Sequence, residues 1–556
     1  MSNEMIKFWF CIVAFVMLPA GMRAQGDDHN FSVAKNMEMF TEVYRNLDML
    51  YVDTLDANKV IGTGINAMLR SLDRYTEYYP AEASKELKYQ LTAKYAGIGA
   101  TIRYNYKEGC SYIDMPYNGM PAYEVGLKKG DMIISIDDST MVGKETSYVS
   151  DRLRGDAGTS FVLKVKRPST GKEMKFKITR RLIQTPVIPY YGMLNDTVGY
   201  ISLQTFSEGC SKLFRNAVID LKHKGMKKLV FDLRDNGGGS EAEAVNIVNV
   251  FVPKGKLVVQ NRGKMKRTNR DFLTQVEPVD TLMPVVVLVN EQTASASEIT
   301  SGALQDMDRA VVMGTTTYGK GIVQTMLELP YNAQMKLTTN KFYMPSGRCI
   351  QARNFRKKGG YGSEEVVGDS LAKVFYTVNG REVKDAVGIE PDIKVEPDSM
   401  PNITYHFVAL RDSAEVVLGY VLDYIKSHPS IPPAADFSLT DADFEDFKAR
   451  VVGSSFKYTP LGEKAYKALV DIARFEGYYD DAKEEFEALE KKLKPDVTKE
   501  MDNAKATIMQ LLEREIVSAY YGPEGVARNA LRSDKFLKEA LELLDNIERY
   551  REILRL

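Results

Sequence analysis

The sequence predicts a multidomain α/β protein, and three observations support this prediction. The chain has 556 residues, enough for three or four domains of ordinary size. Residues 186–398 alternate strand-like apolar runs with segments of helical periodicity, which favours an α/β layer. Residues 91–183 contain short apolar runs separated by glycines, which indicates an inserted β-rich domain.

Helical patterns flank these two regions. In residues 27–90 apolar side chains recur at helical spacing, and a second helix is expected over Ala57–Leu72. Residues 401–556 are richly charged and mostly helical in pattern, with a loop or linker at Pro429–Pro433. We therefore expect a helical N-terminal region at 27–90 and a helical C-terminal domain at 401–556.

The first 24 residues resemble a secretory signal. Lys7 precedes the apolar run Phe8–Leu18, and Pro19 and a short stretch ending at Ala24 follow. Eleven apolar residues are too few to cross a bilayer, although a membrane anchor is the alternative. We expect residues 1–24 to be removed and the protein to be exported to the periplasm or cell envelope. No other run reaches 18 apolar residues, so no membrane span is expected after removal of the signal.

Composition argues against several function classes. The net charge is −1, without the basic excess of a nucleic-acid-binding protein. The cysteines of the mature chain, Cys110, Cys210 and Cys349, lack the spacing of a metal site. We expect no metal and no cofactor. One disulfide is possible in an exported protein, but the sequence does not choose the pair.

A serine follows a strand-like run in the middle of the chain. The run is Val285–Val289, and Thr293-Ala294-Ser295-Ala296-Ser297-Glu298 comes shortly after it. A serine between a strand and a helix is either an ordinary N-cap or a nucleophile beside the helix N-terminus. Ser295 is the candidate nucleophile, and Ser297 is the second choice.

A lysine on the exit loop of the next strand can supply the base that this serine needs. Lys320 lies 25 residues after Ser295, within Tyr318-Gly319-Lys320-Gly321, and the apolar run Ala310–Met313 precedes it. Histidine is the usual base, but none of the chain's four histidines lies in a segment of catalytic pattern. Lysine can replace it if burial lowers its pKa from about 10.4 toward about 7.5. A solvated charge in a glycine turn is the alternative reading.

A third segment can stabilise negative charge. The apolar run Leu229–Leu233 is followed by Gly237-Gly238-Gly239, a turn that presents backbone N–H groups without side-chain cover. Such a turn suits an oxyanion hole. A phosphate loop is the alternative, but no Gly-Lys-Ser or Gly-Lys-Thr follows.

Together these segments resemble the carboxyl-terminal processing peptidases, a family of Ser/Lys proteases that carry a PDZ domain. The resemblance covers roughly residues 35–395. The segments that carry it are Val198–Ile201, Asp232–Gly239, Asn290–Glu298, Asp308–Ala310, Gly319–Gln324, Pro345–Arg348 and Gly388–Asp392. It implies a ClpP/crotonase-like protease core at 186–398. The long helical tail after residue 400 departs from a typical member of that family. It could dock back, form a homo-oligomer or bind an adaptor, and a purely structural cap is the alternative.

The resemblance also implies roles for individual residues. Ser295 matches the family's nucleophile, Lys320 its general base, and Gln324 the glutamine that orients the lysine. The backbone N–H of Ala296 matches one oxyanion donor, and a glycine of the Gly237–Gly239 turn, most simply Gly239, matches the other.

Residues 91–183 resemble a PDZ domain. Its carboxylate-binding loop is matched by Gly97-Ile98-Gly99-Ala100, and its central helix-turn-strand by Leu127–Ile136. Such a loop offers backbone donors to a peptide C-terminus while the peptide adds as a β-strand. A buried glycine turn without a ligand is the alternative.

The prediction is therefore an exported serine endopeptidase with a Ser/Lys dyad that cuts proteins near their C-termini. Its partners would be proteins or peptides with free C-termini, selected by the PDZ-like domain. The alternative from another class is a non-catalytic PDZ scaffold whose protease core has lost activity. Against it stands the presence of Ser295, Lys320 and Gln324 together.

Overall fold

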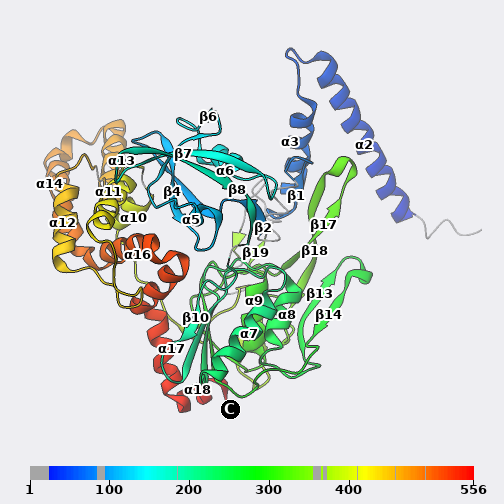
Figure 1. The fold of residues 1–556 in the computed structure, drawn as a ribbon. Helices are drawn as coiled ribbons and strands as arrows, with labels where there is room; N and C mark the ends of the chain where they lie inside the picture. Colours follow the sequence, from blue (N-terminus) through cyan, green and yellow to red (C-terminus); the bar gives the residue numbers. More distant parts are fainter. Residues whose placement is uncertain are drawn as a thin grey trace, which may run out of the picture.

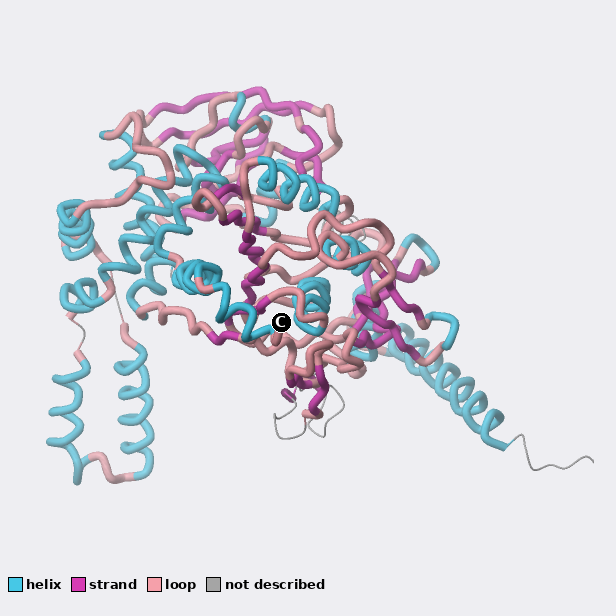
Figure 2. The backbone as a smooth tube through the Cα atoms, turned by 90° about the horizontal axis from the view of Figure 1, so that it is seen from below, coloured by secondary structure: helices cyan, strands magenta, loops and turns pink. Residues whose placement is uncertain are grey.

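The structure is a computed structural model that describes residues 24–83, 94–184, 186–354, 365–366, 372–409, 411–456, 459–494 and 496–556. Except for Ala24, the predicted signal at 1–24 lies outside the described residues. Figure 1 shows three bodies: a central α/β layer, a β-rich domain above it and a helical region beside both. A long N-terminal helix extends away from them, as Figure 2 also shows.

A six-stranded sheet forms the centre of the α/β layer. Its order is β10-β11-β12-β15-β16-β23, with β10 antiparallel to β11 and the other neighbours parallel. The strands are β10 (Tyr191–Met193), β11 (Val198–Ser202), β12 (Lys228–Asp232), β15 (Val285–Val289), β16 (Val311–Gly314) and β23 (Ile393–Lys394). β15 is buried along its whole length, as its continuous valine-rich sequence predicts for a parallel strand covered on both faces.

Helices cover both faces of this sheet (Figure 1). One face packs against α7 (Cys210–His223), α8 (Glu241–Val248) and α9 (Ala296–Asp306). The other packs against the last two helices of the chain, α17 (Lys535–Asp545) and α18 (Ile547–Leu554). Their docking is also polar, because Arg234 after β12 bonds Asp534 at the start of α17. Part of the long helical tail thus docks back and completes the α/β layer.

A second sheet, in which all neighbouring strands are antiparallel, includes a strand from the N-terminal region. Its order is β1-β18-β13-β14, and β17 pairs with β18 in a long hairpin. The strands are β1 (Glu77–Tyr79), β13 (Leu257–Gly263), β14 (Arg270–Leu273), β17 (Ile322–Glu328) and β18 (Gln334–Tyr343). Two small pairs, β19 (Arg353–Asn354) with β20 (Glu365–Val366) and β21 (Val374–Tyr376) with β22 (Glu382–Lys384), complete this part of the chain.

The β-rich domain predicted at 91–183 has its own core. The sheet order is β3-β4-β5-β7-β8, with β6 paired to β5, and a separate β2–β9 pair joins the two ends of the domain. The elements are β2 (Lys94–Gly97), β3 (Ala100–Asn105), β4 (Cys110–Pro116), α5 (Pro121–Glu124), β5 (Met132–Ile136), β6 (Ser139–Thr140), α6 (Thr146–Leu153), β7 (Ser160–Arg167), β8 (Lys172–Thr179) and β9 (Arg181–Gln184). Their buried side chains form one cluster around Ile133, Leu163 and Val165.

The helical region forms a further core beside the β-rich domain. Its helices are α10 (Asn402–Ala409), α11 (Arg411–Ser427), α12 (Asp441–Val452), α13 (Leu461–Glu476), α14 (Lys483–Leu493), α15 (Val497–Asn503) and α16 (Lys505–Ala530). Phe407, Phe444 and Phe447 are buried at its centre. The Pro429–Pro433 stretch lies in the connection between α11 and α12, as predicted.

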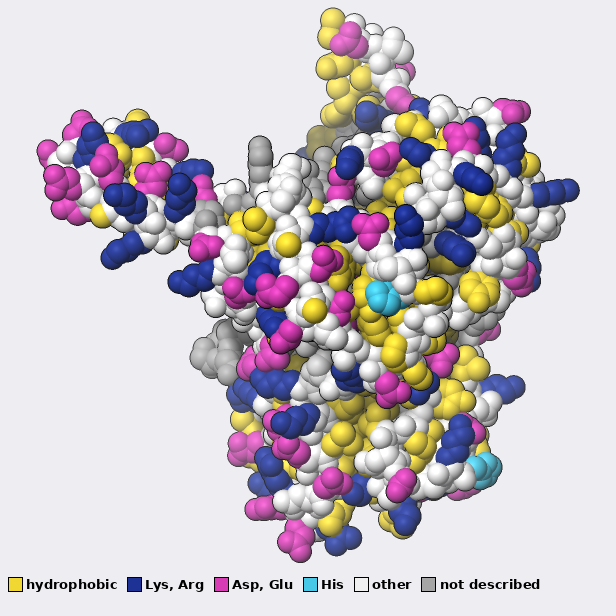
Figure 3. Space-filling view, turned by 60° about the vertical axis from the view of Figure 1, so that its left-hand side comes forward, with side chains coloured by type: hydrophobic (Ala, Val, Ile, Leu, Met, Phe, Trp, Pro, Cys, Tyr) yellow, Lys and Arg dark blue, Asp and Glu magenta, His cyan; other side chains and the backbone are white. Residues whose placement is uncertain are grey.

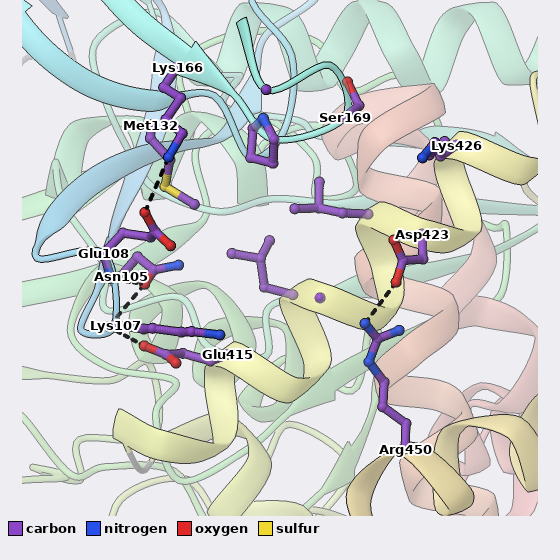
Figure 4. A pocket seen from close by; sticks show the side chains of 15 residues that line it. Asn105, Lys107, Glu108, Met132, Lys166, Ser169, Glu415, Asp423, Lys426 and Arg450 are labelled. Carbon is purple, nitrogen blue, oxygen red and sulfur yellow. Dashed lines mark hydrogen bonds and ion pairs between the residues drawn. The ribbon is translucent and has the colours of Figure 1, made fainter. Parts of the chain in front are cut away.

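The helical region packs directly against the β-rich domain. Lys129 is buried between them, with its Nζ 2.7 Å from both Asp114 of β4 and Glu515 of α16. Leu418 of α11 packs with Met132 of β5 in a small shared apolar cluster. Next to this contact is a cavity of about 390 Å³, which Figure 4 shows between the β-rich domain and α11. Paired charges across this junction hold the two parts together.

The prediction of a helical region at 27–90 is only partly right. α2 (Ala24–Leu50) and α3 (Ala57–Arg70) are helices, but residues 77–79 form strand β1, which pairs with β18. The Asp73 carboxylate accepts hydrogen bonds from the N–H groups of Tyr75 and Thr76, and this turn separates the helical segment from β1. Many large apolar side chains of α2 are exposed, including Phe31 and Leu50.

Three further features bear on the composition argument. Cys110, Cys210 and Cys349 are all free, so the described residues contain no disulfide between them. Among the described residues no helix is long and apolar enough to cross a membrane. Figure 3 shows charges of both signs mixed over the visible face, without a continuous basic area.

Candidate active site

Ser295 lies at the junction between β15 and α9, at the N-cap of the helix. The turn before it is fixed locally, because the Thr293 hydroxyl donates to the carbonyl of Leu233 at the end of the neighbouring strand. Ser295 itself has φ +58°, a left-handed conformation that is costly for a residue with a side chain. Its side chain remains partly exposed while its neighbours on α9 are buried. The structure thus presents this hydroxyl at the surface of a rigid core.

The Gly237–Gly239 turn lies directly against Ser295. A Cβ at Gly238 would come within 2.8 Å of the Ser295 Cβ and 2.9 Å of the Ala296 nitrogen, so only glycine fits there. The Gly238 N–H donates to the Asn236 side chain and is therefore occupied. Within the described chain the N–H groups of Gly239 and Ala296 have no protein acceptor. These two free donors fit the predicted oxyanion hole, and their catalytic role stays a prediction.

Ser297 occupies a different environment from Ser295. Its side chain is fully buried, and its hydroxyl donates to the carbonyl of Asn236 at 2.9 Å. A nucleophile must reach a substrate carbonyl, and this hydroxyl cannot. The geometry therefore favours Ser295 over the second choice.

A buried carboxylate connects the serine to the lysine. Glu298, on the first turn of α9, accepts the N–H of Ser295 at 2.8 Å and the N–H of Lys320 at 2.9 Å with the same oxygen. Its other oxygen accepts the N–H of Gly319 and the hydroxyl of Thr317. Burial, the largest cause, raises the pKa of Glu298. The Glu298 side chain therefore fixes the backbone of both candidate catalytic residues relative to each other. The sequence signal for this role is the spacing Ser295-x-x-Glu298, which is typical of a capping box.

Lys320 has the environment that a lysine base requires. Burial lowers its pKa from 10.5 to about 8, and the nearby charge of Lys336 contributes in the same direction. Glu298, Asp73 and Glu77 act against this change. The Lys336 charge is itself held in place, because its Nζ lies 2.5 Å from the Glu77 carboxylate. A pKa near 8 leaves an appreciable neutral fraction near pH 7.5, as a general base needs.

Gln324 lies on β17, four residues after Lys320. Its side-chain amide donates to the Thr338 hydroxyl on β18 at 3.5 Å, and no hydrogen bond to Lys320 occurs among the described residues. Its orienting role stays a prediction.

Tyr75, before β1, and Glu77, within β1, were not predicted to belong to the site. Tyr75 places its ring 4.6 Å from the Lys320 Nζ, and Glu77 pairs with Lys336. No local pattern in the sequence signals this, because the segment lies some 245 residues before the lysine and only the tertiary fold brings the two together.

Replacing Glu298 with glutamine is expected to damage both stability and activity. Glutamine offers only one acceptor oxygen, so its amide would face two N–H donors that the carboxylate now satisfies. We expect the free energy of unfolding to fall by about 2 kcal/mol and peptide hydrolysis by about 100-fold. Chemical denaturation and steady-state kinetics measure these effects. Glu291→Gln, on the preceding exposed loop, is the matched control, and wild-type turnover in Glu298→Gln would refute the positioning role.

The PDZ-like domain carries a separate groove of about 450 Å³. Strand β3, which begins at Ala100, and helix α6 line it, together with Gly97 and Ile98. The carbonyls of Ile98 and Gly99 accept hydrogen bonds from the protein, but among the described residues their N–H groups have no acceptor. Two adjacent free N–H groups in a loop that borders a groove suit a carboxylate. Binding by Gly97–Ala100 stays a prediction.

Comparison with known proteins agrees with this geometry. Residues 197–357 match the model of peptidase family S41, residues 113–167 that of a PDZ domain, and residues 408–544 that of the probable PDZ-protease C-terminal helical domain. A carboxy-terminal-processing protease of Bartonella bacilliformis is 32% identical over 355 residues, which are 62% of this chain and 81% of that protein. The chain therefore belongs to peptidase family S41.

Its activity is that of a carboxy-terminal-processing serine protease with a PDZ domain, so the non-catalytic scaffold is not supported. A probable CtpA-like serine protease of Staphylococcus aureus is 33% identical over 326 residues, 58% of this chain and 64% of that protein. Among solved structures, a photosystem II D1 C-terminal processing protease has a TM-score of 0.36 at 23% identity, covering 65% of this chain and 93% of that one. A TM-score this low does not support a conclusion about the fold or the function.

Proposed function

We propose that the protein is an exported endopeptidase in which Ser295 is the nucleophile and Lys320 its base. Neutral Lys320 takes the Ser295 proton as the hydroxyl attacks a substrate carbonyl, and the N–H groups of Gly239 and Ala296 donate to the resulting oxyanion. The leaving amine takes up the proton, and water then releases the acyl group by the same steps. The frame that Glu298 builds around Ser295 and Lys320 is the observation that carries this proposal.

The proposal includes selection of substrates by their C-termini. The free N–H groups of Ile98, which lines the PDZ groove, and of the adjacent Gly99 support it, because they can receive a terminal carboxylate. Ile98 both lines the groove and belongs to the domain core, so it can offer an apolar wall to the last side chain. Export is supported only by the signal-like pattern of residues 1–24.

Amidation of a substrate's C-terminus is expected to weaken its binding. The amide removes the charge that the groove's donors would bind, which costs at least about 1.5 kcal/mol, or roughly a tenfold rise in Kd. Calorimetry on the full-length Ser295→Ala variant measures this with acid and amide forms of one peptide. Acetylating the N-terminus is the matched control and should leave Kd unchanged. Equal affinity of the acid and amide forms would rule out selection by C-termini and leave the protease assignment intact.

A further inference from the structure

The segment between α3 and β1 covers the side chain of the candidate base. The Lys320 Nζ lies 4.6 Å from the centre of the Tyr75 ring, within the range of a cation–π contact. Tyr75 is partly buried and lies between α3 and β1, whereas Lys320 belongs to the loop after β16. Two segments far apart in the chain therefore meet at the amine of Lys320, which must be neutral to act as the base.

Tyr75 is held firmly in this position. On one side, Asp73 accepts the backbone N–H groups of Tyr75 and Thr76, each at 2.7 Å. On the other side, β1 pairs with β18, and the Thr338 N–H donates to the Thr76 hydroxyl. A ring fixed from both sides can define where the flexible lysine side chain ends.

The Tyr75 hydroxyl connects the same segment to the lysine's own loop. It donates to the hydroxyl of Tyr318 at 3.0 Å, two residues before Lys320. The Tyr318 N–H in turn donates to the carbonyl of Thr293, two residues before Ser295. Hydrogen bonds thus link the segment of Tyr75 to the loop of Lys320, and this loop to the turn before Ser295.

We propose that Tyr75 is a positioning residue for the reaction: its ring covers the Lys320 Nζ and keeps water from one side of it. The ring has two opposed electrostatic effects. Its face attracts an ammonium ion, while its bulk removes solvation from that ion. Burial is the largest cause of the lowered pKa of Lys320, and the Tyr75 ring is one of the groups that lie against its amine. This inference rests on the proposed role of Lys320 as the base.

Replacing Tyr75 with leucine is expected to shift the pH dependence of the protease. Water reaches the amine, the pKa of Lys320 rises toward its usual range, and the neutral fraction at a given pH falls. We expect kcat/KM at pH 7.5 to drop about 8-fold, and the acid limb of its pH profile to move up by about one pH unit. The deficit should therefore shrink as the pH rises from 7.5 to 10. Tyr75→Phe keeps the ring and should stay within about 3-fold of the wild type.

Tyr78→Leu is the matched control, because it removes a tyrosine from the same segment without uncovering the amine; its acid limb should not move. If the leucine variant does not fold, Tyr75→Met repeats the comparison with another apolar side chain that lacks a ring. An acid limb at the wild-type position in the ringless variant, whether or not the rate falls, overturns the proposal. A fully active Lys320→Arg variant would instead overturn the proposed base, so the two failures are distinguishable.

Discussion

Ser295→Ala is expected to lower peptide hydrolysis by about 10⁴-fold or more while leaving the protein folded. The variant loses the atom that forms the acyl-enzyme, and the oxyanion donors alone cannot replace a covalent route. Steady-state kinetics with a peptide substrate measures the loss, and a thermal melt checks the fold. Alanine keeps the Cβ, so the positive φ at this position stays strained and the variant should melt at about the same temperature as the wild type.

Ser297→Ala is the control variant that distinguishes the two candidate nucleophiles. Its buried hydroxyl donates to the Asn236 carbonyl, so its loss should lower the free energy of unfolding by about 1 kcal/mol. Peptide hydrolysis should fall much less than in Ser295→Ala. A fluorophosphonate probe should still label Ser297→Ala and should fail to label Ser295→Ala. Near-normal turnover of the alanine variant at 295, or labelling that survives there, would reject Ser295 as the nucleophile.

The central layer and the two candidate catalytic residues could be predicted because their signals are local. Each candidate follows an apolar strand: Ser295 comes after β15, and Lys320 comes after β16. Parallel strands end at the same edge of a sheet, so residues that follow neighbouring strands lie close together in space. The glycine turn after β12 shows the same logic, because its strand pairs with β15.

What the sequence did not predict depends on contacts between distant segments. Tyr75 contacts Lys320 only because β1 pairs with β18. The local sequence, with its three tyrosines at 75, 78 and 79, does not indicate which strand β1 will pair with. Likewise the amphipathic pattern at 536–556 indicates helices but not the surface that they cover. The hydrogen bonds of the Tyr550 hydroxyl with the backbone of Val285 fix that choice in the folded protein.

Lys320→Arg is expected to be as inactive as Lys320→Ala, although arginine preserves the positive charge. A guanidinium group does not lose its proton in a protein, so it cannot accept one from Ser295. For the wild type the same mechanism predicts a pH dependence. Lys320 must be neutral to act, and its pKa is about 8, so kcat/KM should rise with pH through about 8 and level off above it.

The charge beside the base allows this reasoning to be checked without removing the base. Lys336 lowers the pKa of Lys320, so Lys336→Gln should raise that pKa and move the acid limb of kcat/KM to higher pH. The variant also frees the Glu77 carboxylate, whose negative charge acts in the same direction. Activity in Lys320→Arg, or an acid limb far below pH 8 in the wild type, would mean that another group removes the proton. Lys320 would then have only an electrostatic or structural part in the reaction.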